Sequence, residues 1–270
     1  EVYPERLEVF TKAIRAEYPD MQIVGSSGPS ADGDKFDYLW PEMKRIGVDL
    51  VDEHYYNTPG WFINNQDYYD RYDRAKPKVY LGEYAAHLPG RPNNIETALA
   101  EALYLTSVER NGDIVSMTSY APLLAKEGHT QWNPDLIYFN NREVKPTVGY
   151  YTQLLYGQNS GDSYLPADRK IDNPRQDVQK RIGTSVVRDS KTGDWIVKLV
   201  NLLPVPVKAK VEGLTPVENG KVVLQVLSGK PTDKNARPVK KEITMAELSQ
   251  YEMPAYSLNV IRVKVAGTKK

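Results

Sequence analysis

The chain has 270 residues, of which 40% are hydrophobic, and its 35 Lys and Arg residues balance 35 Asp and Glu residues. This composition indicates a globular protein with one large domain or two smaller ones. Without an excess of basic residues or a long apolar run, the sequence argues against nucleic-acid binding and against an integral membrane protein. The absence of cysteine excludes disulfides, thiolate catalysis and cysteine metal sites in this chain.

Short apolar segments alternate with amphipathic helices as far as residue 157. Helices are expected at 3–17, from residue 34, at 65–75, at 94–111 and from residue 146, and strands at 21–24, 48–51, 78–81 and 114–117. A strand plus a helix every 30 residues or so is the repeat of a (β/α)8 barrel, in which roughly 250 residues make eight units. The four units here predict half of such a barrel. A doubly wound sheet is the alternative, although residues 25–28 lack the spacing of a phosphate-binding glycine loop.

Beyond residue 160 the pattern changes to short β-type segments. They occupy residues 184–188, 195–200, 205–211, 222–227 and 258–265, and residues 191–194 have the composition of a hairpin turn. The charged, proline-bearing stretch 229–247 is expected to be a long surface loop. The fold class is therefore predicted to be α/β plus all-β, with a half-barrel followed by a β-sandwich.

In a barrel, catalytic groups come from the carboxyl ends of the strands. Glu83 follows a predicted strand directly and is preceded by a glycine, which makes it the best candidate acid. His54 follows the neighbouring strand and is either a fixed structural histidine or a direct substrate contact. A metal site is not expected, because consecutive strand residues point to opposite faces and Glu53 cannot join both of its neighbours on one ion.

Aromatic side chains offer a second signal. Trp61, Phe62 and Trp132 could line a sugar-binding cleft, because aromatic faces cover the apolar C–H patches of sugars. Core packing is the alternative interpretation, and it is expected to hold for most of the tyrosines. Trp61 and Phe62 are the stronger candidates for lining a cleft, because they are expected in a loop just after a strand end.

Taken together, several segments of the chain resemble the α-L-arabinofuranosidases of glycoside hydrolase family 51. The resemblance lies in residues 51–56, 80–85, 119–123, 132–135, 137–140 and 253–260, in the family's order and spacing. It implies the C-terminal half of a (β/α)8 TIM barrel, strands five to eight, over residues 1–157. A jelly-roll-like β-sandwich domain would follow over residues 158–270. The implied activity is retaining hydrolysis of terminal α-L-arabinofuranosyl groups, without a cofactor, on arabinose-containing polysaccharides or oligosaccharides.

The resemblance also implies roles for particular residues. Glu83 takes the position of the nucleophile, and Tyr56 that of the tyrosine that orients it and contacts the sugar. His54 belongs to the same motif as Tyr56, and Trp132 and Asn133 are expected near the pocket. The acid/base glutamate of the family lies in a Gly-Asn-Glu motif at the end of strand four, but the dipeptide Asn-Glu does not occur in this sequence.

We therefore expect the chain to be the C-terminal part of a larger enzyme with activity EC 3.2.1.55, and to be inactive alone. A half-barrel has unpaired strand edges, so pairing with the missing N-terminal half or with another copy is expected. Secreted or periplasmic location is favoured over the cytoplasm. The alternatives are a non-catalytic carbohydrate-binding protein that uses the β-sandwich, and a related retaining glycosidase acting on xylosides or β-glucans.

Overall fold

The computed structural model describes residues 2–75, 77–214 and 222–265. Two compact units can be distinguished, and each is described by itself. Unit 1 holds residues 1–57, 67–85 and 111–121, and unit 2 holds residues 58–66, 86–110 and 122–270. Within the described ranges, no helix combines the length and apolarity needed to cross a bilayer. Unit 1 is α/β and unit 2 is rich in antiparallel strands, which agrees with the predicted α/β plus all-β composition.

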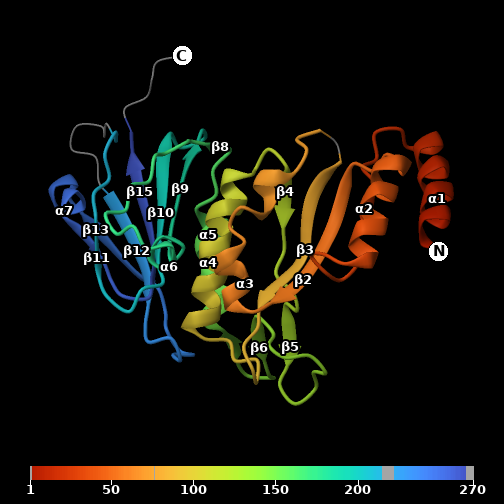
Figure 1. Ribbon diagram of the computed structural model, residues 1–270. Coiled ribbons are helices and arrows are strands. Elements are labelled where there is room, and N and C mark those ends of the chain that lie inside the picture. Colours follow the sequence, from red (N-terminus) through yellow and green to blue (C-terminus); the bar gives the residue numbers. More distant parts are fainter. Residues whose placement is uncertain (1, 76, 215–221, 266–270) are drawn as a thin grey trace. The chain divides into compact units, whose positions relative to one another are not determined.

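A four-stranded sheet forms the centre of unit 1 (Figure 1). Its order follows the chain, with β1 at Val24–Ser26, β2 at Leu50–Asn57, β3 at Lys78–Ala86 and β4 at Val115–Thr118. β1 pairs in parallel with β2, and β3 pairs in parallel with β4. Each parallel pair therefore brings the carboxyl ends of its two strands to the same edge of the sheet.

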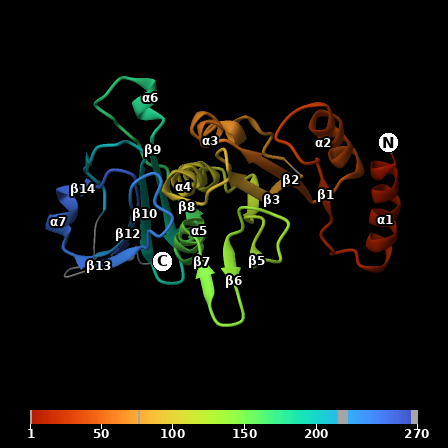
Figure 2. The same cartoon turned by 90° about the horizontal axis from the view of Figure 1, so that it is seen from below.

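Two helices of unit 1 pack beside this sheet, and Figure 2 shows α1 and α2 next to β1. α1 spans Tyr3–Glu17 and begins with a proline in its first turn, where the missing N–H costs no hydrogen bond. α2 spans Asp34–Ile46 and ends at Gly47, whose φ of 77° suits a glycine. The helices and strands enclose a small hydrophobic core formed by Ile23, Met43, Val48 and Val51.

Unit 2 is organised around one buried helix. α4 spans Ile95–Arg110, and apart from Glu96 and the last two residues its whole surface is buried. It packs against α3 (Pro59–Asn64), α5 (Val148–Gln158) and β9 (Ile182–Asp189). Because other elements cover α4 on several sides, the helix lacks the strong polar face of a surface helix.

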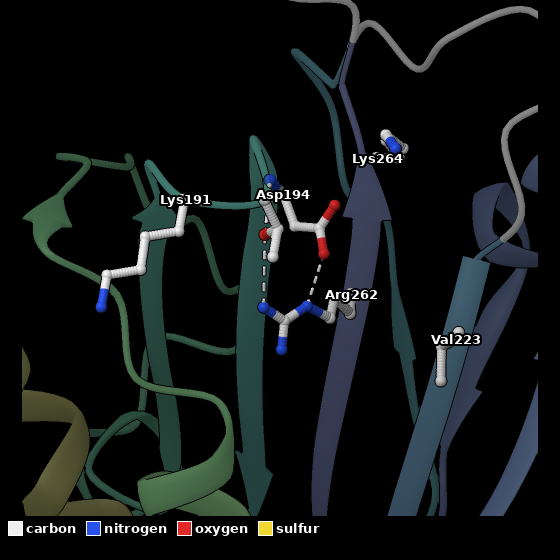
Figure 3. A pocket seen from close by; sticks show the side chains of 6 residues that line it. Lys191, Asp194, Val223, Arg262 and Lys264 are labelled. Atoms are coloured by element: carbon white, nitrogen blue, oxygen red, sulfur yellow. Dashed lines mark hydrogen bonds and ion pairs between the residues drawn. The ribbon is translucent and has the colours of Figure 1, made fainter.

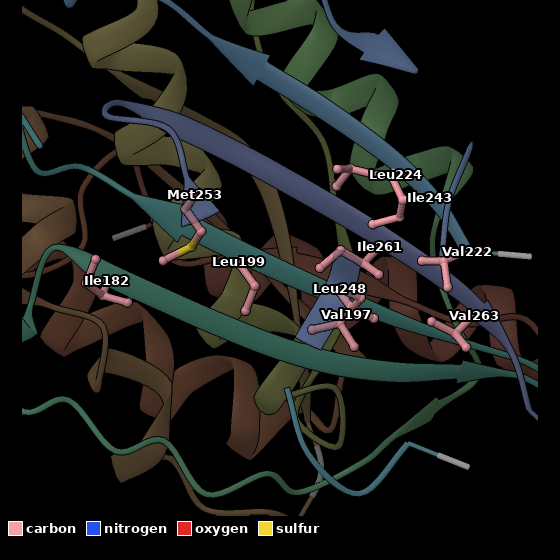
Figure 4. Packing of buried hydrophobic residues seen from close by; sticks show 10 residues of the cluster. All are labelled: Ile182, Val197, Leu199, Val222, Leu224, Ile243, Leu248, Met253, Ile261 and Val263. Carbon is pink, nitrogen blue, oxygen red and sulfur yellow. The ribbon is translucent and has the colours of Figure 1, made fainter. Parts of the chain in front are cut away.

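An antiparallel sheet of six strands in the order β13–β12–β15–β10–β9–β8 covers one side of α4. Its opposite face carries a hydrophobic core, to which the β11–β14 pair and α7 contribute (Figure 4). The strand bounds not yet given are β8 Ser163–Tyr164, β10 Asp194–Asn201, β11 Val207–Ala209, β12 Val222–Ser228, β13 Val239–Ile243, β14 Tyr251–Met253 and β15 Ser257–Lys264. The small sheet consists of β5 Leu124–Lys126, β6 Ile137–Phe139 and β7 Val144–Pro146, and two short helices are α6 Gln176–Gln179 and α7 Met245–Ser249.

A buried ion pair joins α4 to the six-stranded sheet. The Lys198 ammonium, on β10, lies 2.5 Å from a carboxylate oxygen of Glu109 and donates to the carbonyl oxygen of Asn159 at 2.8 Å. The Lys198 side chain has no exposed surface, and it also lies over the ring of Tyr156. Burial lowers the pKa of Lys198, and the Glu109 carboxylate opposes that shift. Such a pair fixes the docking of the helix, since either charge alone would be buried without compensation.

Three predicted elements differ in the structure. Residues 65–75 do not form the predicted α-helix. The α-helix lies earlier in the chain, at α3, where the Thr58 side chain caps its N-terminus. Only a short 3-10 helix, η1, follows at Tyr68–Arg71. The predicted loop 229–247 contains β13, and α7 begins within it behind the capping box of Thr244 and Glu247. The alternation at 205–211 yields a strand of three residues only, β11. The predicted hairpin turn at 191–194 is confirmed between β9 and β10.

Candidate active site

The carboxyl-terminal part of β2 separates its side chains onto two faces. Asp52, His54 and Tyr56 alternate along one face of the strand, and Glu53 and Tyr55 along the other. Glu53 is fully buried and accepts hydrogen bonds from the Trp40 indole and the hydroxyls of Tyr69 and Tyr72, all in unit 1. Glu53 thus takes no part in a cluster with its two sequence neighbours, as strand geometry predicts.

Glu83, on β3, meets the polar face of β2. The Tyr56 hydroxyl donates to its Oε2 at 2.6 Å, and His54 Nδ1 lies 3.6 Å from the same oxygen. The Glu83 side chain is 39% exposed, so its carboxylate is anchored at one oxygen and open to solvent. The structure therefore brings together three of the predicted site residues, Glu83, His54 and Tyr56.

Asp52 completes this cluster, although the sequence alone did not single it out. Its Oδ2 lies 2.8 Å from His54 Nε2, on the opposite side of the imidazole ring from Glu83. A Cβ atom on Gly82 would lie 1.9 Å from Asp52 Oδ1 and 3.1 Å from His54 Nε2. Only a glycine before Glu83 leaves room for the Asp52–His54 pair. The signal in the sequence was the spacing of two between residues 52, 54 and 56.

Hydrogen bonds from the neighbouring strand end fix the backbone next to Glu83. The Ser119 hydroxyl, just after β4, donates to the carbonyl oxygen of Gly82 at 2.6 Å. The Tyr80 hydroxyl lies 2.9 Å from the Ser119 hydroxyl, and the Ser119 amide donates to the carbonyl oxygen of Leu81. These contacts tie the backbone that precedes Glu83 to the segment that follows β4.

The electrostatics of the cluster follow from partial burial. Burial raises the pKa of Asp52, and the neighbouring His54 opposes the shift, while the charge of Glu83 adds to it. Burial, and then the hydrogen bond to the Glu83 carboxylate, raise the pKa of Tyr56 above its ordinary value. Tyr56 therefore keeps its proton across the physiological range and remains a donor to Glu83.

Trp132 and Asn133 belong to unit 2, in the loop between β5 and β6. The Trp132 side chain is 62% exposed, and the Asn133 side chain accepts a hydrogen bond from the Tyr138 hydroxyl at 3.2 Å. Their expected place near the pocket stays a prediction. Phe62 is fully buried and meets the Tyr104 ring edge-on at 5.1 Å, so core packing is the correct interpretation for Phe62.

The described residues contain no group of three or more His, Asp or Glu side chains arranged to hold a metal ion. Asp52, His54 and Glu83 form a chain of pairwise contacts through the imidazole ring, with the two carboxylates on different ring nitrogens. Glu83 receives one proton-donating contact, from Tyr56, and has the His54 ring beside the same oxygen, an arrangement that suits a nucleophile at Glu83.

A hollow lies on the six-stranded sheet of unit 2 (Figure 3). Arg262 crosses it and bonds Asp189 and Asp194 at 2.6 Å each, so its charge is already matched by two carboxylates. The side chains that line the hollow include no aromatic ring: Lys191, Thr192, Asp194, Val223, Arg262 and Lys264. An open hollow without an aromatic face is poorly suited to sugar binding.

Two family models match the chain. The model described as alpha-L-arabinofuranosidase C-terminal domain matches residues 65–261, and the model described as alpha-L-arabinofuranosidase 1 domain matches residues 1–74. An extracellular exo-α-L-arabinofuranosidase of Streptomyces chartreusis is 47% identical over 163 residues, which are 60% of this chain and 19% of that protein. A probable α-L-arabinofuranosidase A of Aspergillus oryzae is 36% identical over 60% of this chain and 25% of its own length.

Solved structures agree with these matches. An arabinose-bound α-L-arabinofuranosidase of family GH51 has a TM-score of 0.80 and 27% identity over 98% of this chain and 43% of its own. An arabinose complex of the α-L-arabinofuranosidase from Thermotoga maritima has a TM-score of 0.70 at 15% identity, over 97% of this chain and 62% of its own, and shows the fold alone. The chain spans about a fifth to a quarter of the curated relatives named above. It belongs to the α-L-arabinofuranosidase C-terminal domain family.

Proposed function

We propose that this chain is part of a retaining α-L-arabinofuranosidase and that Glu83 is its nucleophile. The observation that carries the proposal is the position of Glu83 on β3, with the Tyr56 hydroxyl 2.6 Å from one carboxylate oxygen and the imidazole of His54 beside it. In this proposal, residues 1–157 are strands five to eight of a (β/α)8 barrel, with the site at the strand ends. Residues 158–270 form a jelly-roll-like β-sandwich.

The reaction has two displacement steps. Glu83 attacks the anomeric carbon of the terminal arabinofuranosyl group, a covalent glycosyl-enzyme forms, and the bond to the leaving oxygen breaks as that oxygen is protonated. Water then attacks the same carbon and releases arabinose with its original anomeric configuration. Tyr56 holds one oxygen of Glu83 in place throughout, since it remains protonated.

Protonation of the leaving oxygen requires a general acid. Retaining enzymes place a second carboxyl group about 5–5.5 Å from the nucleophile. Asp52 is bonded to His54, and Glu53 is buried on the other face of β2, so neither side chain is free to protonate a leaving group. The proposal therefore requires an acid/base carboxyl group that neither Asp52 nor Glu53 supplies. Without that group, the chain alone is expected to react about 10²–10⁴-fold more slowly than the complete enzyme.

The substrate follows from the relatives. Proteins named α-L-arabinofuranosidase, and an arabinose-bound structure, support a terminal arabinofuranosyl group on a polysaccharide or oligosaccharide as the substrate. We assign sugar contacts to His54, Tyr56, Trp132 and Asn133. Because the Streptomyces relative is named extracellular, secretion is the location that we propose.

The test uses the full-length protein and an aryl α-L-arabinofuranoside. Hydrolysis is expected, with the first arabinose product in the α configuration by NMR. Glu83→Ala should abolish turnover, and azide should restore release of the aryl group while giving an azide product of inverted configuration. Glu143→Ala is the matched control, since that side chain is exposed at 62% in unit 2.

Two results would contradict the proposal. Full turnover by Glu83→Ala would exclude Glu83 as the nucleophile. Hydrolysis of aryl xylosides or β-glucans, with no action on arabinofuranosides, would replace the substrate class.

A further inference from the structure

The carboxylate of Asp52 has no role in the reaction as described, yet it lies within the cluster that holds Glu83. We propose that Asp52 is a positioning residue, which fixes the imidazole of His54 so that its Nδ1 edge faces the nucleophile. The inference rests on the proposed function of Glu83 and extends it to Asp52, which does not contact the Glu83 oxygen that attacks the sugar.

The first step is the contact between Asp52 and His54. A carboxylate offers only acceptor atoms, so the bond of 2.8 Å between Asp52 Oδ2 and His54 Nε2 places a proton on Nε2. Fixing one ring nitrogen fixes the orientation of the whole ring. The other nitrogen, Nδ1, is thereby held 3.6 Å from Glu83 Oε2.

The second step concerns the oxygen that His54 faces. Glu83 Oε2 already accepts the Tyr56 hydroxyl at 2.6 Å, so the phenol and the imidazole flank the same atom. A separation of 3.6 Å is longer than a hydrogen bond, so the imidazole acts on this oxygen by packing beside it. The ring limits the rotation of the Glu83 carboxylate, which leaves the other oxygen, Oε1, for the anomeric carbon.

The third step is the space behind the pair. Gly82 precedes Glu83, and a Cβ atom there would overlap Asp52 Oδ1 at 1.9 Å. Asp52 therefore packs directly against the backbone that carries the nucleophile. The charged groups that face it are His54 on its own strand and Glu83 on β3. Asp52 is enclosed between His54 and this backbone, which sets a positioning role apart from that of a general acid.

The experiment compares Asp52→Ala and Asp52→Asn in the full-length protein, with aryl α-L-arabinofuranosides of good and poor leaving groups. Asp52→Ala is expected to lower kcat by about 10²-fold with KM nearly unchanged, because a small misplacement of a reacting group costs about that much. The loss should be equal for both leaving groups, since the nucleophile is displaced and protonation is not affected. Asp52→Asn keeps an oxygen that can accept from Nε2, and should recover most of the rate.

Asp49→Ala is the matched control. Asp49 precedes β2 at its other end, where its carboxylate accepts from Arg15 and from the Ile23 amide. The control variant removes a bonded carboxylate next to the same strand and is expected to lower thermal stability while leaving kcat unchanged. A structural role alone would make the two alanine variants behave alike.

A second measurement does not depend on turnover. Nitrogen-15 NMR of labelled histidine should show a protonated Nε2 on His54, assigned with a His54→Gln variant, and Asp52→Ala should change that signal while leaving His87 and His129 unaltered. If the wild type hydrolyses no arabinofuranoside, the proposed function fails and this spectrum alone decides the role of Asp52. An unchanged His54 signal, a kcat within twofold of the wild type, or a loss confined to poor leaving groups would each overturn the inference.

Discussion

Replacing Gly82 with alanine tests the packing behind the nucleophile. The new Cβ atom would lie 1.9 Å from Asp52 Oδ1, whereas real Cβ contacts do not fall below 3.0 Å, so the carboxylate must move by at least about 1.1 Å. A movement of that size breaks the bond of 2.8 Å between Asp52 and His54. Overpacking of this kind typically costs about 1–3 kcal/mol of stability, and a misplacement of about 1 Å costs about 10²-fold in rate.

The assay pairs kinetics with unfolding in the full-length protein. Gly82→Ala is expected to lower kcat on an aryl α-L-arabinofuranoside by about 10²-fold and to lower the unfolding free energy modestly. Gly157→Ala is the matched control, because Gly157 lies in α5 and an added Cβ there meets nothing within 4 Å. That variant should keep full activity and gain about 0.4–1 kcal/mol of stability. Wild-type kcat in Gly82→Ala would refute the reasoning, as it would show that the Asp52–His54 pair can move freely.

Three further predictions concern other contacts. Tyr56→Phe removes the hydrogen-bond donor to Glu83. Because a hydrogen bond to a charged group is worth about 1.5–3 kcal/mol, kcat/KM should fall by about 10- to 150-fold. An unchanged kcat/KM would show that this hydrogen bond does not contribute to catalysis. Lys198→Met leaves the Glu109 carboxylate without its cationic partner, although the Ser185 hydroxyl still donates to it, and should cost about 3–5 kcal/mol in urea unfolding. A loss below 1 kcal/mol would contradict a stabilising role of this ion pair. Burial raises the pKa of Glu101 to about 8, so the folded state binds more protons than the unfolded state between about pH 4.5 and 8, and stability should fall as pH rises through that window. Glu101→Gln should remove this slope, and an identical slope in both proteins would contradict the assignment.

The alternation of side chains along a strand explains how much of the site was predictable. It correctly separates Glu53 from its neighbours and places His54 and Tyr56 together, while the glycine before Glu83 indicates a close approach of other groups. The pairing of Asp52 with His54 was not predictable, because a spacing of two shows which residues share a face but not which side chains bond to one another.

The errors in the fold have a related cause. Tyr68 and Tyr69 lie within the predicted helix 65–75 and are buried, but they belong to a 3-10 helix. The α-helix begins earlier because the Thr58 side chain accepts from the Trp61 amide and Pro59 suits a first turn. Local capping decides such boundaries, and apolar periodicity does not record it. The strand β13 was missed since its residues are mostly exposed and charged.

Covalent labelling tests whether Glu83 is the nucleophile of a retaining arabinofuranosidase. The full-length protein would be treated with a mechanism-based arabinofuranosyl inhibitor, digested, and analysed by mass spectrometry. One label is expected, on Glu83, which forms as activity is lost and is absent in Glu83→Gln. A label on another carboxylate, or loss of activity with Glu83 unmodified, would contradict it.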